Sequence, residues 1–179
     1  MSQLNEKKVA ILSENGFEEV ELTSPKQALE AAGVKVDVIS PQEKTIKAWD
    51  VDKWGKDYNV DIPLDKADAS QYNALLLPGG VLNPDSLRIN DKALAFIKKF
   101  EDEGKIIASI CHGPWTLAET GYLKGRKVTS FKSISTDLKN AGADWSDQEV
   151  VIDNNLITSR FPDDLPAFNK AFIAALEAK

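Results

Sequence analysis

The sequence predicts an α/β fold in which a mostly parallel sheet carries helices on both faces. Two observations predict it: short apolar runs alternate along the chain with helical patterns, and several of these runs stop at polar or glycine-rich turns. Ligands of such sheets bind beyond the carboxyl ends of the strands. We therefore expect the turns at residues 14–18, 78–85 and 111–113 to converge on one cleft.

The first strand is expected at residues 8–13 (KVAILS), which form a short β-branched run. Thr23-Ser24-Pro25 resembles a helix cap followed by a proline at the first helical position, and Gly33 resembles a stop, so a helix is expected between them. Residues 34–40 (VKVDVIS) alternate strictly and predict a second strand.

Residues 41–57 show neither a clean helical nor a clean strand pattern, and we expect them to be irregular. They contain Trp49 and Trp54 among several charged residues. Two interpretations stay open: a surface excursion whose tryptophans cover apolar surface, or a segment for binding or oligomer contact. A short strand is expected at residues 58–62 before Pro63.

The middle of the chain repeats the strand–turn–helix order. Residues 72–77 (YNALLL) predict a buried strand that ends at Pro78-Gly79-Gly80, and residues 91–103 predict a helix that Gly104 stops. The strand Ile106–Ile110 then ends at a turn that leads into a helix closed by Gly121. The later expected elements are a strand at 127–131, a helix at 135–141, a β-hairpin of 149–152 with 156–159, and a helix at 165–176.

Composition limits what the protein can be. The absence of repeats and linkers in 179 residues predicts one domain over residues 1–179, and the net charge of −6 argues against nucleic acid as a partner. No apolar run is long enough for a membrane span or signal peptide, so we expect a cytoplasmic protein with no membrane partner. One cysteine and one histidine exclude a four-ligand Cys/His zinc site, and we expect no metal and no cofactor.

Cys111 is the only cysteine and His112 the only histidine, so any thiol or imidazole chemistry must occur at this turn. A cysteine between a buried strand and a helix start is expected to have a lowered thiol pKa, because the helix dipole stabilises the thiolate. The alternative is a buried cysteine that only fills space. His112 is the candidate base, although adjacent side chains usually point apart, and its alternative role is packing over the helix start.

Other groups near the turn complete the candidate site. Backbone amides at Gly79, Gly80 and His112 are candidates for an oxyanion hole. Glu18 lies at the mouth of the expected cleft. The residues alone do not separate it from three neighbouring carboxylates, those of Glu14, Glu19 and Glu21, and each of these has the alternative role of a solvated helix-start carboxylate.

Several blocks of the sequence are characteristic of a known family: ALLLPGG with NPDSLR after it, ASICHGPWTLAETG, GRKVTS, NAGADW and SRFPDDLPAF. Through them, nearly the whole chain resembles the PfpI family of intracellular cysteine peptidase-like and deglycase-like proteins. That family lies in the superfamily of the Parkinson-associated deglycase and the class I glutamine amidotransferases. The resemblance implies a flavodoxin-like three-layer sandwich that forms homodimers or higher homo-oligomers. Amidotransferase chemistry is excluded because it needs a second histidine.

The resemblance also implies roles for particular residues. Cys111, on a strand-to-helix nucleophile elbow, matches the nucleophile, and His112 matches its neighbouring histidine. Glu18, within FEEVEL, matches the acidic partner of the cysteine. In peptidase-like members an acidic residue after the LPGG turn reaches the histidine of a neighbouring subunit, and Asp85 occupies that position here. Apart from the resemblance, we expect Gly79, Gly80 and Gly113 to form the substrate-binding or oxyanion side of the site.

Three functions follow as hypotheses. The first is a cysteine-dependent stress enzyme, of the glutathione-independent glyoxalase or deglycase type, that acts on small dicarbonyls or glycated protein side chains. In it the Cys111 thiolate attacks the carbonyl carbon and Glu18 transfers protons. The second is a peptidase or amidase that uses Cys111, His112 and Asp85 of a second subunit. The third is a redox-sensing or chaperone-like stress protein in which Cys111 oxidises to a sulfinic acid held by Glu18.

Overall fold

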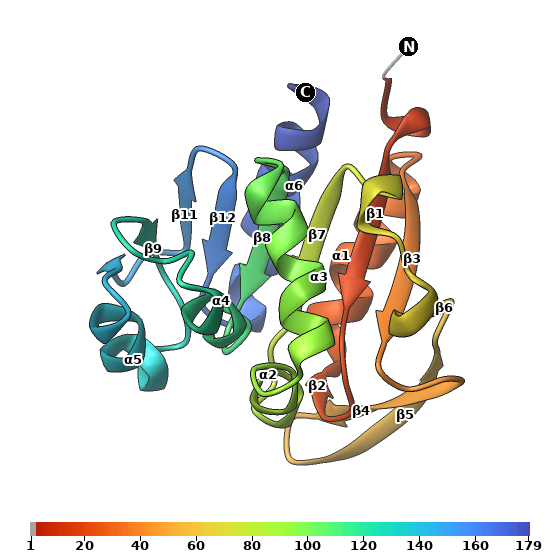
Figure 1. The fold of residues 1–179 in the computed structure, drawn as a ribbon, viewed down its shortest axis with the longest axis horizontal. Coiled ribbons are helices and arrows are strands. Elements are labelled where there is room, and N and C mark those ends of the chain that lie inside the picture. The colour runs from red at the N-terminus through yellow and green to blue at the C-terminus, as the bar shows by residue number, and fades with distance from the viewer. Residues whose placement is uncertain (1–2) are drawn as a thin grey trace.

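A computed structural model describes residues 3–179 of the chain. Within these residues, seven strands form the main sheet in the order β11-β12-β8-β7-β1-β3-β6 (Figure 1). All neighbours are parallel except β11, which is antiparallel to β12. The strands are β1 Lys8–Leu12, β3 Lys35–Ser40, β6 Ile62–Pro63, β7 Ala74–Leu77, β8 Ile106–Ile110, β11 Val150–Asp153 and β12 Leu156–Ser159.

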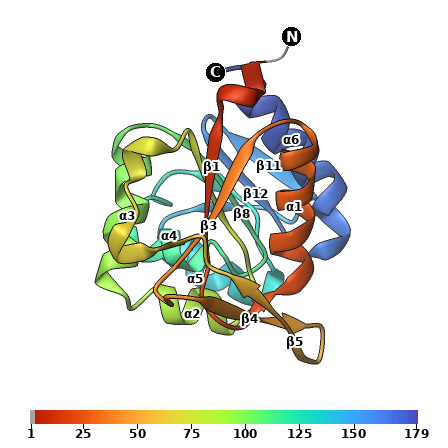
Figure 2. The ribbon, with the colours of Figure 1, turned by 90° about the vertical axis from the view of Figure 1, so that its right-hand side faces the viewer.

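Helices cover both faces of this sheet, as Figure 2 shows from its edge. One face packs on α1 (Glu19–Ala31) and α6 (Leu165–Glu177), and the other packs on α3 (Asp91–Asp102) and α4 (Trp115–Thr120). A hydrophobic core lies on each face of the sheet, and strand β1 contributes side chains to both cores, since its successive side chains point to opposite faces. The arrangement is the flavodoxin-like α/β sandwich that the sequence predicts.

Residues 41–57 are not irregular, contrary to the prediction. They form most of a β-hairpin of β4 (Thr45–Asp50) and β5 (Lys53–Asn59), and β4 pairs with the short strand β2 (Phe17–Glu18). In β4 the buried Ile46 and Ala48 alternate with exposed residues. In β5 no side chain is fully buried, so its sequence lacks an apolar face that would predict a strand. Figure 1 shows the hairpin below the carboxyl ends of the main strands.

Helix α1 begins four residues before the predicted cap. It starts at Glu19, so that Thr23-Ser24-Pro25 lies inside it and the Thr23 hydroxyl donates to the Glu19 carbonyl oxygen at 3.0 Å. The proline has no N–H for the helical hydrogen bond to the carbonyl of Glu21, and packing of the buried face of α1 offsets this loss. As a result, Glu21 lies in the first turn of a helix instead of in a loop.

The remaining elements differ from the predictions in several places, and no single strand spans 58–62, since β5 ends at Asn59 and β6 begins at Ile62. The strand expected at 127–131 is shortened to β9 (Lys127–Val128), which pairs with β10 (Asp144–Trp145) as a separate small sheet. The hairpin of β11 and β12 is confirmed, with Asn154 at φ +54°. Two short helices complete the fold: α2 Leu82–Leu87, which was not predicted, and α5 Ser135–Asn140. Within residues 3–179, no helix is both long and apolar enough to cross a membrane.

Candidate active site

Cys111 occupies the turn between β8 and α4 with φ +63°, a left-handed conformation that a residue with a side chain rarely adopts. Its side chain faces a cavity of about 730 Å³ and is only 7% exposed. The three turns predicted to converge do so, because each contributes residues to the wall of this cavity. These are Gly16 and Glu18 from the first turn, Gly80, Val81 and Leu82 from the second, and Cys111 and His112 from the third.

The Gly79-Gly80 turn lets the backbone approach the thiol closely. A Cβ on Gly79 would lie 2.6 Å from the Cβ of Cys111 and 2.4 Å from Oε2 of Glu21, which no side chain tolerates. Gly80 has φ +74°, and a Cβ there would lie 2.4 Å from the carbonyl oxygen of Gly16. Glycine is therefore required at both positions for the turn to fit against Cys111.

Glu21 is the carboxylate that contacts Cys111. It is 0% exposed, its Oε2 accepts the Gly79 amide at 2.9 Å, and its carboxyl is close enough to the Cys111 thiol for the two groups to shift each other's pKa. Oε1 has no hydrogen-bond partner within residues 3–179. Burial raises the pKa of Glu21 to about 8, and the nearby charge of Glu18 acts in the same direction. The carboxyl is therefore mostly protonated at pH 7.

The assignment of Glu18 as the partner of the thiol is corrected by this geometry. Oε1 of Glu18 accepts the backbone amide of Val51 at 3.3 Å, and the carboxylate lies at the cavity wall, half-buried, with its pKa raised by that partial burial. In a helix that begins at Glu19, the buried residues Glu21, Leu22, Pro25 and Leu29 share one face. This helical spacing distinguishes Glu21 from the neighbouring glutamates. The apparent cap at residues 23–25 placed the predicted helix start after Glu21, so this pattern was not recognised in the sequence.

The expected lowering of the Cys111 pKa is also wrong in direction. Burial raises the pKa of the thiol, and the Glu21 carboxylate raises it further, while hydrogen bonds from the amides of His112 and Gly80 oppose this only in part. Helix α4 is six residues long and begins at Trp115, four positions after the cysteine. Thiol and carboxyl form one coupled pair, which holds its protons at neutral pH.

His112 contacts the thiol in spite of being its sequence neighbour. Its Nδ1 lies 3.2 Å from the Cys111 sulfur, because the left-handed conformation of Cys111 turns the two side chains toward each other. Its Nε2 lies 3.0 Å from Oγ of Ser133, and its ring stacks on Phe131 with centroids 5.0 Å apart. Burial lowers the pKa of the imidazole. Ser133 has no local sequence signal, since it reaches His112 from 21 positions away.

Two of the three glycines predicted for the oxyanion side have amides that are already engaged. The Gly79 amide donates to Glu21, and the Gly113 amide donates to the Ile110 carbonyl oxygen at 2.9 Å. The Gly80 amide faces both the Cys111 thiol and the Glu21 carboxyl, and it acts to lower the pKa of each. Asp85 is exposed on α2, and its contact with a second subunit stays a prediction.

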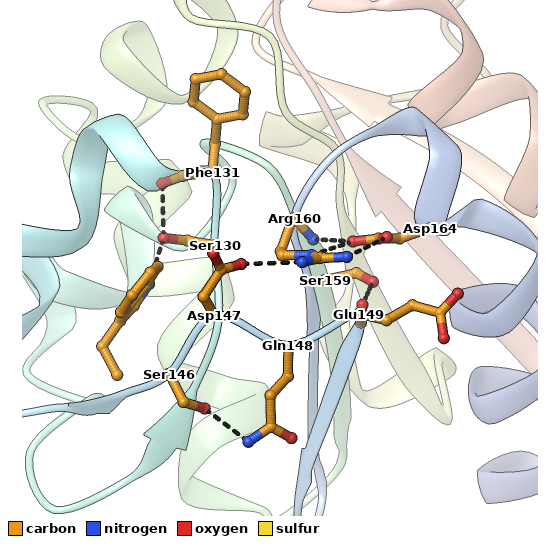
Figure 3. Close-up of polar contacts among 10 residues, drawn as sticks. Ser130, Phe131, Ser146, Asp147, Gln148, Glu149, Ser159, Arg160 and Asp164 are labelled. Carbon is orange, nitrogen blue, oxygen red and sulfur yellow. Dashed lines mark hydrogen bonds and ion pairs between the residues drawn. The ribbon is translucent and has the colours of Figure 1, made fainter.

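An ion-pair network lies next to Phe161 and Pro162, two residues of the cavity wall. Arg160 lies between Asp147 and Asp164 (Figure 3), with Nη1 2.9 Å from Oδ1 of Asp147 and Nε 2.9 Å from Oδ2 of Asp164. Its guanidinium also lies over the ring of Phe161, 4.6 Å from the centroid. Phe161 and Pro162, which line the cavity, are thus attached to a fixed segment.

No metal centre competes with this interpretation in the described part of the chain. Within residues 3–179, no group of three or more His, Cys, Asp and Glu side chains is arranged to hold a metal ion. The cavity wall carries a thiol, two carboxyl groups and an imidazole, which belong to Cys111, Glu18, Glu21 and His112.

Comparisons with known proteins give matches over nearly the whole chain. The DJ-1/PfpI family model matches residues 7–175. A deglycase of Thermococcus kodakarensis is 46% identical over 94% of this chain and 99% of its own length. A putative cysteine protease of Bacillus subtilis is 42% identical over 96% of this chain and 99% of its own. The crystal structure of Drosophila melanogaster DJ-1beta superposes with a TM-score of 0.88 and 29% identity, over all of this chain and 92% of that one.

Proposed function

The chain belongs to the DJ-1/PfpI family, and from this premise we propose that it is a cysteine-dependent enzyme acting on reactive dicarbonyls or early glycation adducts. The observation that carries the proposal is the buried pair of Cys111 and Glu21 at the wall of a cavity. A mostly protonated carboxyl beside a thiol suits proton exchange during addition to a carbonyl. Relatives named as deglycases support the same class of reaction.

The reaction starts when the Cys111 thiol adds to the aldehyde of methylglyoxal. The sulfur–carbon bond forms, the thiol proton passes to the carbonyl oxygen, and the product is a hemithioacetal. The protonated Glu21 carboxyl gives its proton to the neighbouring ketone oxygen and takes the hydrogen of the former aldehyde carbon, which forms an enediol. It then gives that hydrogen to the former ketone carbon and takes the proton of the hydroxyl on the sulfur-bound carbon, which leaves a thioester and the protonated carboxyl. Water cleaves the thioester to release lactate and restore the thiol. The sum is one water added to methylglyoxal, so no glutathione, oxidant or reductant is consumed.

Incubation of the purified protein with methylglyoxal alone is expected to yield lactate, because the site supplies both the nucleophile and the proton carrier. Lactate measured over time without glutathione gives the rate. The variant Cys111→Ala is expected to fall to the uncatalysed background, while Ile152→Ala, exposed on β11, serves as a folding-neutral control. A Cys111→Ala rate equal to that of the wild type would rule out the mechanism.

A peptidase or amidase is the second candidate, favoured by the contact of 3.2 Å between Nδ1 of His112 and the thiol. It would use Cys111 and His112 with Asp85 of a second subunit. Turnover of a fluorogenic peptide amide is then expected to rise with subunit concentration. Mixing Cys111→Ala with Asp85→Asn should restore part of the activity, since some mixed oligomers contain one intact site. Absence of both effects would exclude this function.

A further inference from the structure

We infer that the cavity selects neutral 2-oxoaldehydes that carry a bulky apolar or aromatic group, in preference to methylglyoxal; this rests on the proposed function and names its substrate class. The inference comes from three properties of the described residues: the size of the cavity, its walls, and the charge of the groups that line it.

The cavity is larger than a three-carbon substrate needs. Its volume of about 730 Å³ falls in the range of pockets that enclose ligands of drug size. Methylglyoxal, whose carbon and oxygen atoms number only five, would leave most of this space to water when its aldehyde lies at the Cys111 sulfur. A substituent on the ketone carbon could fill the remainder and bury additional apolar surface.

The walls that such a substituent would meet are apolar and held in place. Two of the aromatic residues in these walls, Phe131 and Phe161, are fixed by contacts with neighbouring segments. The Phe131 amide donates to the Cys111 carbonyl oxygen at 2.9 Å, and Phe161 lies under the paired guanidinium of Arg160. The Phe131 carbonyl oxygen accepts the Ser130 hydroxyl, a contact drawn in Figure 3. The apolar lining consists of Trp49, Val51, Val81, Leu82, Phe131, Phe161 and Pro162.

The tip of the β4–β5 hairpin forms part of this lining. Val51 has φ +61° and is 79% exposed, and the Trp49 indole donates to its carbonyl oxygen at 2.9 Å. Glu18 accepts its amide, so the strained tip is fixed at the cavity. This favours the binding interpretation of the two that the sequence left open for Trp49.

The charges exclude anionic substrates. Within residues 3–179, the lining contains the carboxyl groups of Glu18 and Glu21 and no lysine or arginine. Arg160, which precedes the lining residue Phe161, is already paired with Asp147 and Asp164 (Figure 3). A substrate carboxylate would lose hydration and meet like charge with no compensating partner.

The test compares kcat/KM for methylglyoxal, phenylglyoxal and 4-carboxyphenylglyoxal, each corrected for its reactivity with a free thiol in solution. Phenylglyoxal is expected to exceed methylglyoxal by about tenfold or more, because a buried ring adds apolar contact in the transition state. The carboxylated analogue is expected to fall about tenfold or more below phenylglyoxal. Trp49→Ala and Phe161→Ala should reduce the ratio of phenylglyoxal to methylglyoxal, and Ile152→Ala should leave it unchanged.

Val51→Asn provides a variant that is safe for folding, because the position is exposed and asparagine tolerates positive φ. It should also lower the ratio. If methylglyoxal is converted as well as phenylglyoxal, or if the ratio is the same in all cavity variants, the inference on substrate class is overturned while the proposed function stands. If neither aldehyde is converted, the proposed function itself fails.

Discussion

Glu21→Gln is expected to lower kcat for methylglyoxal by about two to four orders of magnitude, the usual loss when a general acid–base group is removed. Glutamine keeps the size of the side chain, but it can neither give nor accept the proton that moves between the two substrate carbons. In Glu21→Gln, addition of the thiol to the aldehyde should be slowed less than the proton transfer between the two carbons. Single-turnover mass spectrometry should therefore find hemithioacetal at Cys111 in Glu21→Gln, where the wild type releases lactate.

Glu18→Gln is the matched control, since it makes the same chemical change in the same segment. Its carboxylate contacts the Val51 amide and not the thiol, so we expect less than about a tenfold effect on kcat. Equal losses in the two variants, or a larger loss in Glu18→Gln, would contradict the assignment of Glu21. Thermal unfolding of both variants shows whether a loss of activity only reflects a loss of fold.

Stability is expected to fall as the pH rises from about 4.5 to about 8, because of the buried carboxyl of Glu21. Its pKa is about 8 in the folded protein, against 4.5 for an ordinary solvated glutamate. In this interval the folded state keeps a proton that the unfolded chain releases. Each pH unit then removes about 1.4 kcal/mol from the free energy of unfolding, which amounts to roughly 5 kcal/mol over the whole interval. Below pH 4.5 the carboxyl is protonated in both states, and the stability of the folded protein loses nothing through Glu21.

Urea unfolding at pH 5, 6, 7 and 8 measures this slope, and Glu21→Gln isolates its source. Glutamine has no proton to release, so the variant should show a flatter profile, whatever pH-independent penalty its amide brings beside the Gly79 N–H. The difference between wild type and variant is the quantity to follow, because other titrating groups cancel from it. Parallel profiles for the two proteins would show that Glu21 titrates at an ordinary pKa.

Much of the fold could be predicted because its elements carry local signals. Strand β8 was predicted with its observed bounds, since five apolar residues end at a polar turn, and the Asn154 turn identified the β11–β12 hairpin. The local sequence signals failed where packing against other elements determines whether a strand or helix forms. Strand β5 has no apolar face and exists because it pairs with β4, and α1 continues through Pro25 because its buried face packs on the sheet.

The candidate site divides in the same way. The sequence alone determined that any thiol or imidazole chemistry must occur at Cys111 and His112, because no other cysteine or histidine exists. It also determined that three turns meet there, because parallel strands place their carboxyl ends at one edge. Only the tertiary structure decided that Glu21 is the partner of the thiol and that Ser133 is the partner of the imidazole. Burial and hydrogen bonds between distant segments control both choices, and several glutamates close together in sequence cannot be ranked until the packed helix buries one of them.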